Sequence, residues 1–294
     1  MKEYFSVSSS NYVHDTDINI VRPASLNNPK DNAVMFVTEA FLKYADALLK
    51  CRNCLVFWPE GNEIPQAIAD RHAVCVSANP HLQYCMFFRE NNITYLPEQE
   101  KMDYIDGSFI SPHAVIGKNV KIFPGAYIGG QVTVGDNVYI GAGVKILGEV
   151  KIGNNVVIRE NTVIGADGLS TDRDVNGRAA TMPQFGGVIL EDDVQIGAMT
   201  VIARGAIDNT VIGKGSKVDN CCFISHNVQV GKDTFIVGET IMFGSSSVGD
   251  RAYISGNSTI RNGIRIGNET FVGMGSNVIK DIQDGAVVKG NPAR

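Results

Sequence analysis

Large aliphatic residues recur at every sixth position through two long stretches of this chain. The first run steps by six from Ile110 to Ile164 and contains ten β-branched aliphatic residues. The second run steps from Ile212 to Val278 and contains twelve residues, all of them aliphatic or methionine. A period of six matches neither the 3.6-residue period of an α-helix nor the two-residue alternation of an extended strand. It predicts a short strand and a sharp turn, repeated along the chain.

Each six-residue unit has two positions that point inward. The first is the large aliphatic residue, and the second, four residues later, is a small or β-branched residue. Glycine follows many of the aliphatic positions, as Gly117, Gly135 and Gly231 do, and it tolerates the close backbone approach that tight corners need. Stacked units bury a column of Ile and Val that no single unit could bury alone. We therefore predict a parallel β-helix with three hexapeptides in each coil of eighteen residues.

The period also divides the chain. We predict a mainly β protein with a β-helix over 105–283, a short C-terminal tail over 284–294 and a small α/β domain over 1–104. The period stops at 166–187, a segment rich in Gly, Asp and Arg that we expect to be a loop inserted at one corner. It shifts again at 203–210, where a minor corner irregularity and a functional role are both open.

The first 104 residues lack the six-residue period. Residues 33–50 begin like a strand and continue as an amphipathic helix, and residues 54–58 and 72–77 are strand candidates. A helix is expected over 79–90, where Asn79 and Pro80 form a favourable start. Alternating strands and helices predict the α/β fold of this domain.

Charge and apolar patterning exclude several classes of protein. The formal net charge of −5 argues against a nucleic-acid partner. No apolar run approaches the ~20 residues of a membrane span, and the polar N-terminus is unlike a signal peptide, so we expect a cytoplasmic protein without membrane insertion. Cys51 and Cys54 have the spacing of half a zinc site, but no second cysteine pair at that spacing follows. We expect free buried thiols and no metal.

His226 is the last of five histidines, and the other four lie at or before residue 113. It stands in the segment FISHNVQVG (223–231), two positions after the inward Ile224. That phase places His226 at a corner, facing outward, where a substrate can reach it. A solvated corner histidine with no chemical role is the competing interpretation.

The ordered motifs of the chain resemble the UDP-3-O-acylglucosamine N-acyltransferases of lipid A biosynthesis and related hexapeptide enzymes that act on nucleotide-linked amino sugars. The resemblance rests on NPHLQY (79–84), IGADG (164–168), MPQFGGVI (182–189), ARGAIDNTVIG (203–213), VDNCCFISHNVQVG (218–231) and GNSTI (256–260). It implies a left-handed coil, a homotrimer with active sites between subunits, an N-terminal domain that binds the nucleotide base, and His226 as catalytic base.

Acyl transfer from a thioester to an amine needs a base for the amine proton and a donor for the tetrahedral oxyanion. Histidine, which titrates near ~6.5, suits the first task. A step of eighteen residues from His226 leads forward to Gly244 and back to Asp208. We expect the Gly244 N–H to face the acyl oxygen, and either Asp208 or Asn227 to orient the imidazole.

Substrate contacts are expected on both sides of the linker. The resemblance implies an aromatic residue that stacks on the base, for which the candidates are Phe41, Tyr44 and Tyr84, with a core role as the alternative for each. In and beside the inserted loop the resemblance makes Asp167 a candidate for contact with the sugar, and Gln184 and Gly186, which match the PQxG pattern of the family, are further substrate-binding candidates. Shaping the loop is the competing role for all three.

Several positions depart from the lipid A enzymes. Ala203 stands where they carry Asp, Gly263 stands where they often carry a second histidine, and the ending GNPAR resembles coenzyme A-dependent acetyltransferases. We therefore favour a short acyl-CoA donor and a dideoxy amino sugar acceptor. The first alternative is long-chain hydroxyacyl transfer from acyl carrier protein to UDP-3-O-acylglucosamine. The second is a non-catalytic nucleotide-sugar-binding scaffold. A hexapeptide zinc enzyme is rejected, because His226 has no second histidine in its run.

Overall fold

The computed structural model describes residues 2–14, 16–94 and 99–294, which divide into two compact units. Unit 1 contains residues 1–96 and 169–185, and unit 2 contains residues 97–168 and 186–294. Most of the segment expected to be an inserted loop therefore packs with the N-terminal residues. The domain boundaries inferred from the sequence stay predictions.

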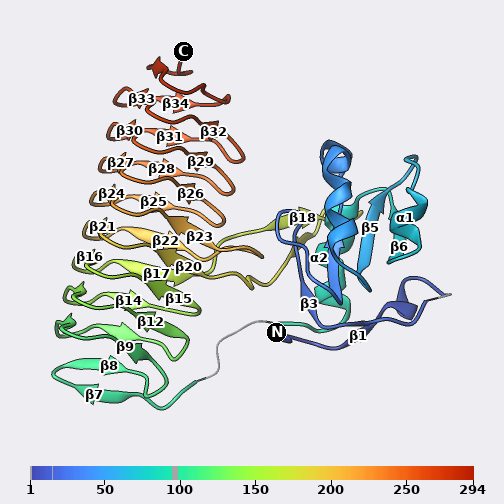
Figure 1. The fold of residues 1–294 in the computed structure, drawn as a ribbon, viewed down its shortest axis with the longest axis horizontal. Helices are drawn as coiled ribbons and strands as arrows, with labels where there is room; N and C mark the ends of the chain where they lie inside the picture. Colours follow the sequence, from blue (N-terminus) through green and yellow to red (C-terminus); the bar gives the residue numbers. More distant parts are fainter. Residues whose placement is uncertain (1, 15, 95–98) are drawn as a thin grey trace. The chain divides into compact units, whose positions relative to one another are not determined.

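Unit 2 is a stack of coils whose short strands form three sheets (Figure 1). The first sheet carries the strand that precedes the His226 turn. Within it β7 and β8 pair antiparallel and all other neighbours pair parallel. Its strands are β7 (Asp103–Ile105), β8 (Ser108–Ile110), β11 (Tyr127–Ile128), β14 (Lys145–Ile146), β17 (Val163–Ala166), β22 (Val201–Ala203), β25 (Phe223–Ile224), β28 (Ile241–Met242), β31 (Thr259–Ile260) and β34 (Asn277–Val278).

The second and third sheets are wholly parallel. The second contains β9 (Val115–Ile116), β12 (Val132–Val134), β15 (Val150–Ile152), β20 (Val188–Leu190), β23 (Thr210–Ile212), β26 (Gln229–Val230), β29 (Ser247–Val248) and β32 (Arg265–Ile266). The third contains β10 (Lys121–Ile122), β13 (Tyr139–Ile140), β16 (Val157–Ile158), β21 (Gln195–Ile196), β24 (Lys217–Val218), β27 (Phe235–Ile236), β30 (Tyr253–Ile254), β33 (Phe271–Val272) and β35 (Val287–Val288).

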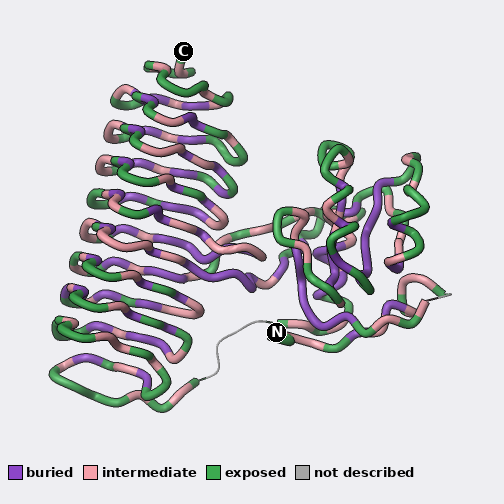
Figure 2. The backbone as a smooth tube through the Cα atoms, viewed as in Figure 1, coloured by how far each residue is buried: buried purple, intermediate pink, exposed green. Residues whose placement is uncertain are grey.

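The six-residue period is the packing rule of this unit. Ile128 pairs with Ile146, eighteen residues later, and the same step relates Ile236 to Ile254. Their side chains are fully buried in one continuous core that runs up the stack. Figure 2 shows buried residues, in purple, recurring from coil to coil. Burial of one such side chain is worth about 1.5–3 kcal/mol, so the column of aliphatic residues holds the coils together.

Two coils are longer than the regular eighteen-residue coil. In one Ile152 pairs with Leu190, and in the next Ile202 pairs with Ile224. At its far end the stack continues beyond the last period-six residue, because β35 pairs with β33. There Phe271 pairs with Val287, a step of sixteen residues that departs from the six-residue period.

Unit 1 has a four-stranded parallel sheet in the order β3 (Arg22–Pro23), β4 (Ala33–Phe36), β5 (Leu55–Pro59) and β6 (Ala73–Ser77). The helix expected after β4 is a 3₁₀ helix, η2 (Glu39–Lys50), and α1 (Gln66–Ala69) is a single turn. The other elements are β1 (Val7–Ser8), η1 (Ser9–Asn11), β2 (Asn19–Ile20), β18 (Thr171–Arg173) and β19 (Ala179–Thr181).

The helix α2 (Pro80–Glu90) begins where the sequence predicts, with the side chain of Asn79 accepting a hydrogen bond from the Leu82 N–H at 3.0 Å. It packs against β4, β5 and the antiparallel pair β18–β19. The 169–185 segment is thus part of the α/β fold rather than an isolated loop. Among the residues that the structure describes, no helix is long and apolar enough to cross a membrane.

Candidate active site

His226 lies on the turn between β25 and β26. The inward residues on either side of it, Ile224 and Val228, are fully buried, whereas His226 and Asn227 are half-buried. Asn227 adopts φ 62°, a left-handed conformation that asparagine tolerates better than most residues. The aliphatic ladder therefore fixes the backbone of this turn while it leaves the imidazole outside the core.

The side chain of Asn227 orients the imidazole. His226 Nδ1 lies 3.1 Å from Asn227 Oδ1, and the same oxygen accepts a hydrogen bond from the Ala206 N–H at 3.0 Å. Asn227 Nδ2 donates to the backbone carbonyl of Asp208 at 2.8 Å. These partners fix which end of the carboxamide is the oxygen. Because that oxygen only accepts, Nδ1 carries the proton and Nε2 has the free lone pair.

Four extra residues in the preceding coil supply this support. The strand register pairs Ile202 with Ile224, which makes Arg204, not Asp208, the equivalent of His226 one coil earlier. The eighteen-residue step to Asp208 was therefore wrong. Asp208 lies in the enlarged turn and contacts Asn227 through its carbonyl group. The shift at 203–210 thus contributes to the surroundings of His226.

Two glycines flank the imidazole. A Cβ built on Gly244 would overlap His226 Nε2, and one built on Gly168 would lie 2.6 Å from His226 Cβ. Only glycine fits at either position without moving the ring. The sequence interpretation missed Gly168, although the motif IGADG, at the edge of the break in the period, is a signal for it.

The backbone N–H of Gly244 lies at the turn one coil beyond His226. Its neighbours are engaged, since the Phe243 N–H donates to the Ile260 carbonyl at 3.0 Å and the Ser245 N–H donates to the His226 carbonyl at 2.9 Å. Within the described hydrogen bonds of this turn, none uses the Gly244 N–H. A lone pair on Nε2 and an uncommitted N–H therefore come from adjacent turns of one corner.

Asp167 precedes Gly168 and has a half-exposed side chain, with Oδ1 4.0 Å from Nη1 of the buried Arg204. Burial raises the pKa of the Asp167 carboxyl, and the nearby Arg204 opposes that rise. Arg204 itself donates from Nε to the Gly186 carbonyl at 2.7 Å. Asp167 is accessible enough to meet a substrate, and Arg204 is a structural support that the sequence interpretation did not single out.

Gln184 and Gly186 shape the chain rather than face solvent. Gln184 in unit 1 is 2% exposed and donates to the Met182 carbonyl at 3.2 Å. In unit 2 a Cβ on Gly186 would lie 2.8 Å from the Gly205 carbonyl oxygen. The loop-shaping alternative fits both residues better than contact with a sugar.

The three aromatic candidates for base stacking differ in exposure. Phe41 and Tyr44 on η2 are 50% and 53% exposed, with ring centroids 6.2 Å apart. Tyr84 is fully buried and packs on Phe36 and Phe88, at centroid distances of 4.9 and 5.0 Å. Tyr84 is a core residue and offers no free ring face, so that candidate was wrong. Phe41 and Tyr44 stay predictions.

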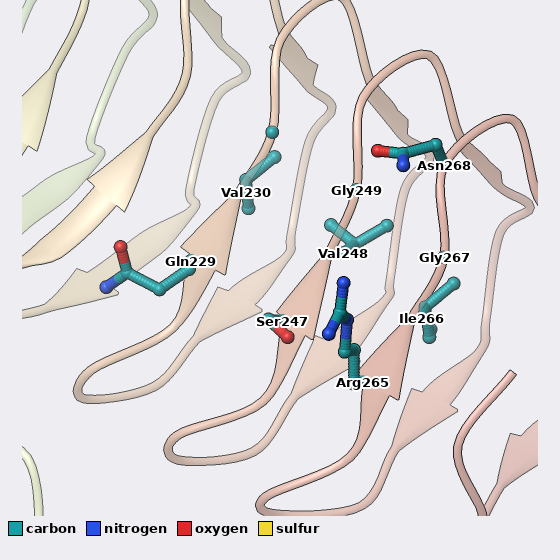
Figure 3. A pocket seen from close by; sticks show the side chains of 10 residues that line it. Gln229, Val230, Ser247, Val248, Gly249, Arg265, Ile266, Gly267 and Asn268 are labelled. Carbon is teal, nitrogen blue, oxygen red and sulfur yellow. The ribbon is translucent and has the colours of Figure 1, made fainter. Parts of the chain in front are cut away.

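A shallow pocket of about 210 Å³ lies on the second sheet (Figure 3). Gln229, Ser247 and Arg265 line it from the successive strands β26, β29 and β32. It begins on the coil of His226 and extends toward the C-terminal coils. Repeat residues such as Val230 and Gly231 line it, but none of the catalytic or substrate-binding residues predicted from the sequence does.

Comparison with known proteins agrees with the repeat. The family model described as bacterial transferase hexapeptide (six repeats) matches residues 113–148 and 134–166. The solved UDP-N-acetylglucosamine acyltransferase from Campylobacter jejuni covers 64% of this chain and 71% of its own, with a TM-score of 0.56 at 22% identity. A second UDP-N-acetylglucosamine acyltransferase, from Bacteroides fragilis 9343, covers the same shares with a TM-score of 0.51 at 26% identity. The predicted left-handed parallel β-helix is confirmed.

Curated relatives carry the name that the motifs suggested. A UDP-3-O-acylglucosamine N-acyltransferase of Methylobacterium nodulans is 38% identical over 138 residues, which are 47% of this chain and 39% of that protein. One from Francisella tularensis subsp. holarctica is 49% identical over 79 residues, or 27% of this chain and 23% of that protein. The resemblance stated from the sequence is confirmed. The chain matches less than half the length of these relatives.

Proposed function

We propose that this chain is an N-acyltransferase that moves an acyl group from a thioester to the amine of a nucleotide-linked amino sugar. The observation that carries the proposal is the His226 turn. There Asn227 holds the proton on Nδ1, Nε2 is free to accept another, and the uncommitted N–H of Gly244 comes from the next coil. The curated relatives are named as N-acyltransferases, which supports the same reaction.

The reaction follows from these groups. The amine nitrogen attacks the thioester carbonyl, and a C–N bond forms while His226 Nε2 takes the proton that the nitrogen loses. The Gly244 N–H donates to the oxyanion that develops on the carbonyl oxygen. When the intermediate collapses, the C–S bond breaks and the departing sulfur receives the proton from His226. The products are an amide and a free thiol.

The acceptor is best supported as UDP-3-O-acylglucosamine, because that substrate is part of the name of the matching relatives. This favours the reading that we ranked second from the sequence, in which acyl carrier protein supplies a long hydroxyacyl chain. A short acyl-CoA and a dideoxy amino sugar form the second candidate. Two departures from the lipid A enzymes favour it. Ala203 stands where those enzymes carry Asp. Gly263, where a Cβ would meet no atom within 4 Å, stands where they often carry a second histidine.

One experiment separates these readings. The purified chain is given UDP- and dTDP-linked amino sugars with acetyl-CoA, hydroxybutyryl-CoA or a hydroxyacyl-acyl carrier protein, and mass spectrometry detects the amide. We expect a product with one donor and acceptor pair, and a loss of ~100-fold or more in kcat for His226→Ala. His113→Ala is the matched control, since His113 is an exposed histidine on the same corner of the first coil.

Two outcomes contradict the proposal. Full activity of His226→Ala removes the histidine from the mechanism. If a folded protein that still binds a nucleotide sugar forms no amide with any pair of donor and acceptor, the chain is a non-catalytic scaffold.

We also propose that the chain assembles as a homotrimer, as the resemblance implies. Light scattering at micromolar concentration would then give three times the chain mass of 31.7 kDa. A monomer at that concentration would contradict both the trimer and an active site shared between subunits.

A further inference from the structure

Three buried residues of unit 1, which the proposed reaction does not use, lie together: Cys51, Cys54 and His72. Each residue offers one ligand atom, a sulfur or a ring nitrogen, and these three atoms lie within 4.8 Å of one another; each residue is at most 5% exposed. Cys51 directly follows η2, Cys54 directly precedes β5, and His72 directly precedes β6. Three separate elements of the α/β fold therefore converge on one small volume.

The distances suit a tetrahedral cation. The two sulfurs are 3.7 Å apart. Two sulfurs bound to one tetrahedral zinc, each at about 2.3 Å, are about 3.8 Å apart, and a bound sulfur and a bound imidazole nitrogen are about 3.6 Å apart. Side-chain adjustments of at most about 1 Å would bring all three atoms to zinc-binding distances.

The imidazole of His72 is held in the orientation that a ligand needs. Nε2 lies 3.0 Å from the Leu48 carbonyl oxygen, which only accepts, so Nε2 carries the proton and Nδ1 has the lone pair. A metal-binding histidine commonly donates its other N–H to a backbone carbonyl in this way. Nδ1 now accepts the Cys54 N–H at 3.2 Å, a hydrogen bond that a bound cation would displace.

Charge also favours a divalent cation. Two thiolates would balance the charge of Zn²⁺, which lowers the cost of placing it in a buried volume. The negative charge of the Asp31 carboxylate interacts electrostatically with all three residues. The positive charge of the Arg71 guanidinium interacts with Cys51 and His72 and partly offsets the effect of Asp31 there. The Lys30 carbonyl oxygen, 3.2 Å from Cys54 Sγ, is one candidate for the fourth ligand.

We propose that Cys51, Cys54 and His72 bind one Zn²⁺ per chain, which ties the end of η2 to β5 and β6. Binding converts two thiols to zinc thiolates and releases two protons to solvent. The site is structural, since its residues are buried and lie outside the His226 turn. It does not depend on the proposed acyl transfer, and its test reads no activity.

The test uses the full chain without a metal-binding tag, stripped by a chelator and then titrated with Zn²⁺ against a chromophoric competitor. We expect one Zn²⁺ per chain, two protons released, and a thiolate-to-metal charge-transfer band when Co²⁺ replaces Zn²⁺. Cys51→Ser, Cys54→Ser and His72→Gln should each lower the zinc affinity ~100-fold or more, since even the outer partners of metal ligands are worth about 10–100-fold.

Cys75→Ser and Cys221→Ser are the matched controls, because neither cysteine belongs to the cluster. Both should bind zinc like the unchanged chain. If a ligand variant does not fold, the unchanged chain still decides, since stoichiometry, proton release and the cobalt band need no variant. The proposal is overturned if the stripped chain takes up no Zn²⁺, or if folded Cys51→Ser and Cys54→Ser bind it undiminished.

Discussion

The coils from β27 to β34 and the coils between β17 and β26 obey the same packing rule but differ at one corner. In the C-terminal coils every described turn from the first sheet to the second is short, and partners are eighteen residues apart. In the middle coils two consecutive turns at that corner are enlarged, since Ile152 pairs with Leu190 and Ile202 pairs with Ile224. The very next turn carries His226.

This difference shows that the inward residues determine how the coils stack, whereas the corner residues can vary and form the candidate site. Ile202 and Ile224 pair as they would in a regular coil, although four extra residues lie between their strands. The extra residues bring the Ala206 N–H and the Asp208 carbonyl to the side chain of Asn227. The aliphatic ladder fixes the coil, and the interrupted corner builds the site.

The largest effect is expected from making the interrupted coil regular. Deletion of Gly205–Asp208 brings Ile202 and Ile212 to a six-residue spacing. It removes both backbone partners of Asn227 and also the Gly205 backbone groups that hydrogen-bond to Gly186 and Gly187, so the whole turn beside His226 is rebuilt. We expect the urea midpoint of unit 2 to change little, while kcat falls ~1000-fold, within the range that acid–base catalysis contributes. Acyl transfer within tenfold of the unchanged chain would show that the enlarged turn has no part in catalysis.

The matched control removes four residues from a regular coil. Deletion of Glu239–Met242 shifts the ladder by four. Small residues such as Ser246 and Ala252 then take the large aliphatic positions, and polar residues such as Asp250 and Asn262 take the second inward positions. This variant should unfold or become insoluble, as judged by circular dichroism and size-exclusion chromatography. A folded control would contradict the claim that the period alone specifies these coils.

The next effect concerns the glycine beside the imidazole. In Gly244→Ala the new Cβ overlaps His226 Nε2, so the ring must move, and a displacement of about 1 Å can cost ~100-fold in rate. Gly129→Ala is the control, because its nearest new contact is an ordinary 3.5 Å. Steady-state kinetics compares the two, and equal kcat values would contradict the placement of the ring against Gly244.

A smaller effect is expected at the residue that orients the imidazole. Asn227→Gly keeps the left-handed φ at no steric cost but removes the carboxamide. We expect kcat to fall ~10-fold, the equivalent of one hydrogen bond of about 1.4 kcal/mol. Ser245→Gly is the control, since Ser245 has φ 58° at the same corner one coil on. A drop as large in Ser245→Gly would indicate a backbone effect rather than a lost contact.

The smallest effect concerns the inserted segment in unit 1. Burial raises the pKa of Asp172, but hydrogen bonds from the Arg173 N–H, His81 and Asn79 outweigh burial and hold the pKa below its ordinary 3.8. A carboxyl whose pKa is lower in the folded state adds stability above its ordinary pKa, and that stability is lost as the pH falls through the folded value. Acid should therefore weaken the packing of α2 against β18–β19 and lower the free energy of unfolding of unit 1.

Asp172→Asn should remove this pH dependence. We expect the free energy of unfolding of unit 1 at pH 6 to fall by about 1 kcal/mol in the variant, with a smaller difference below about pH 4. The fluorescence of Trp58, the single tryptophan of the chain and buried in β5, follows this unit in urea. A difference that is the same at both pH values would contradict a role of the Asp172 charge.

The sequence predicts the coils well because the rule is local and repeated. Each inward Ile or Val has the same neighbours one coil away, so the period alone determines which residues pair. The helix start at Asn79 and the strand near residue 55 were found in the same way, from local signals.

The contacts that cross the period are harder to predict. The orienting partner of Asn227 is a backbone carbonyl, which no residue type reveals, and the eighteen-residue step fails in the one coil with four extra residues. Tyr84 matched a helical pattern that core and binding residues share. His72 lies far along the chain from Cys51 and Cys54, so the cysteine spacing alone does not reveal that the fold brings it beside them.

The pairing of Ile152 with Leu190 also has a consequence for chain entropy. The loop that this pairing closes is about twice as long as the regular loop between Val134 and Ile152 in the coil before it. For a flexible chain, closing the longer of two such loops costs only about 0.7 kcal/mol more. That is less than the burial of one aliphatic side chain contributes. A β-helix can therefore accommodate an inserted segment as long as a whole coil, and the strands on either side of the insertion still pair at little cost in free energy.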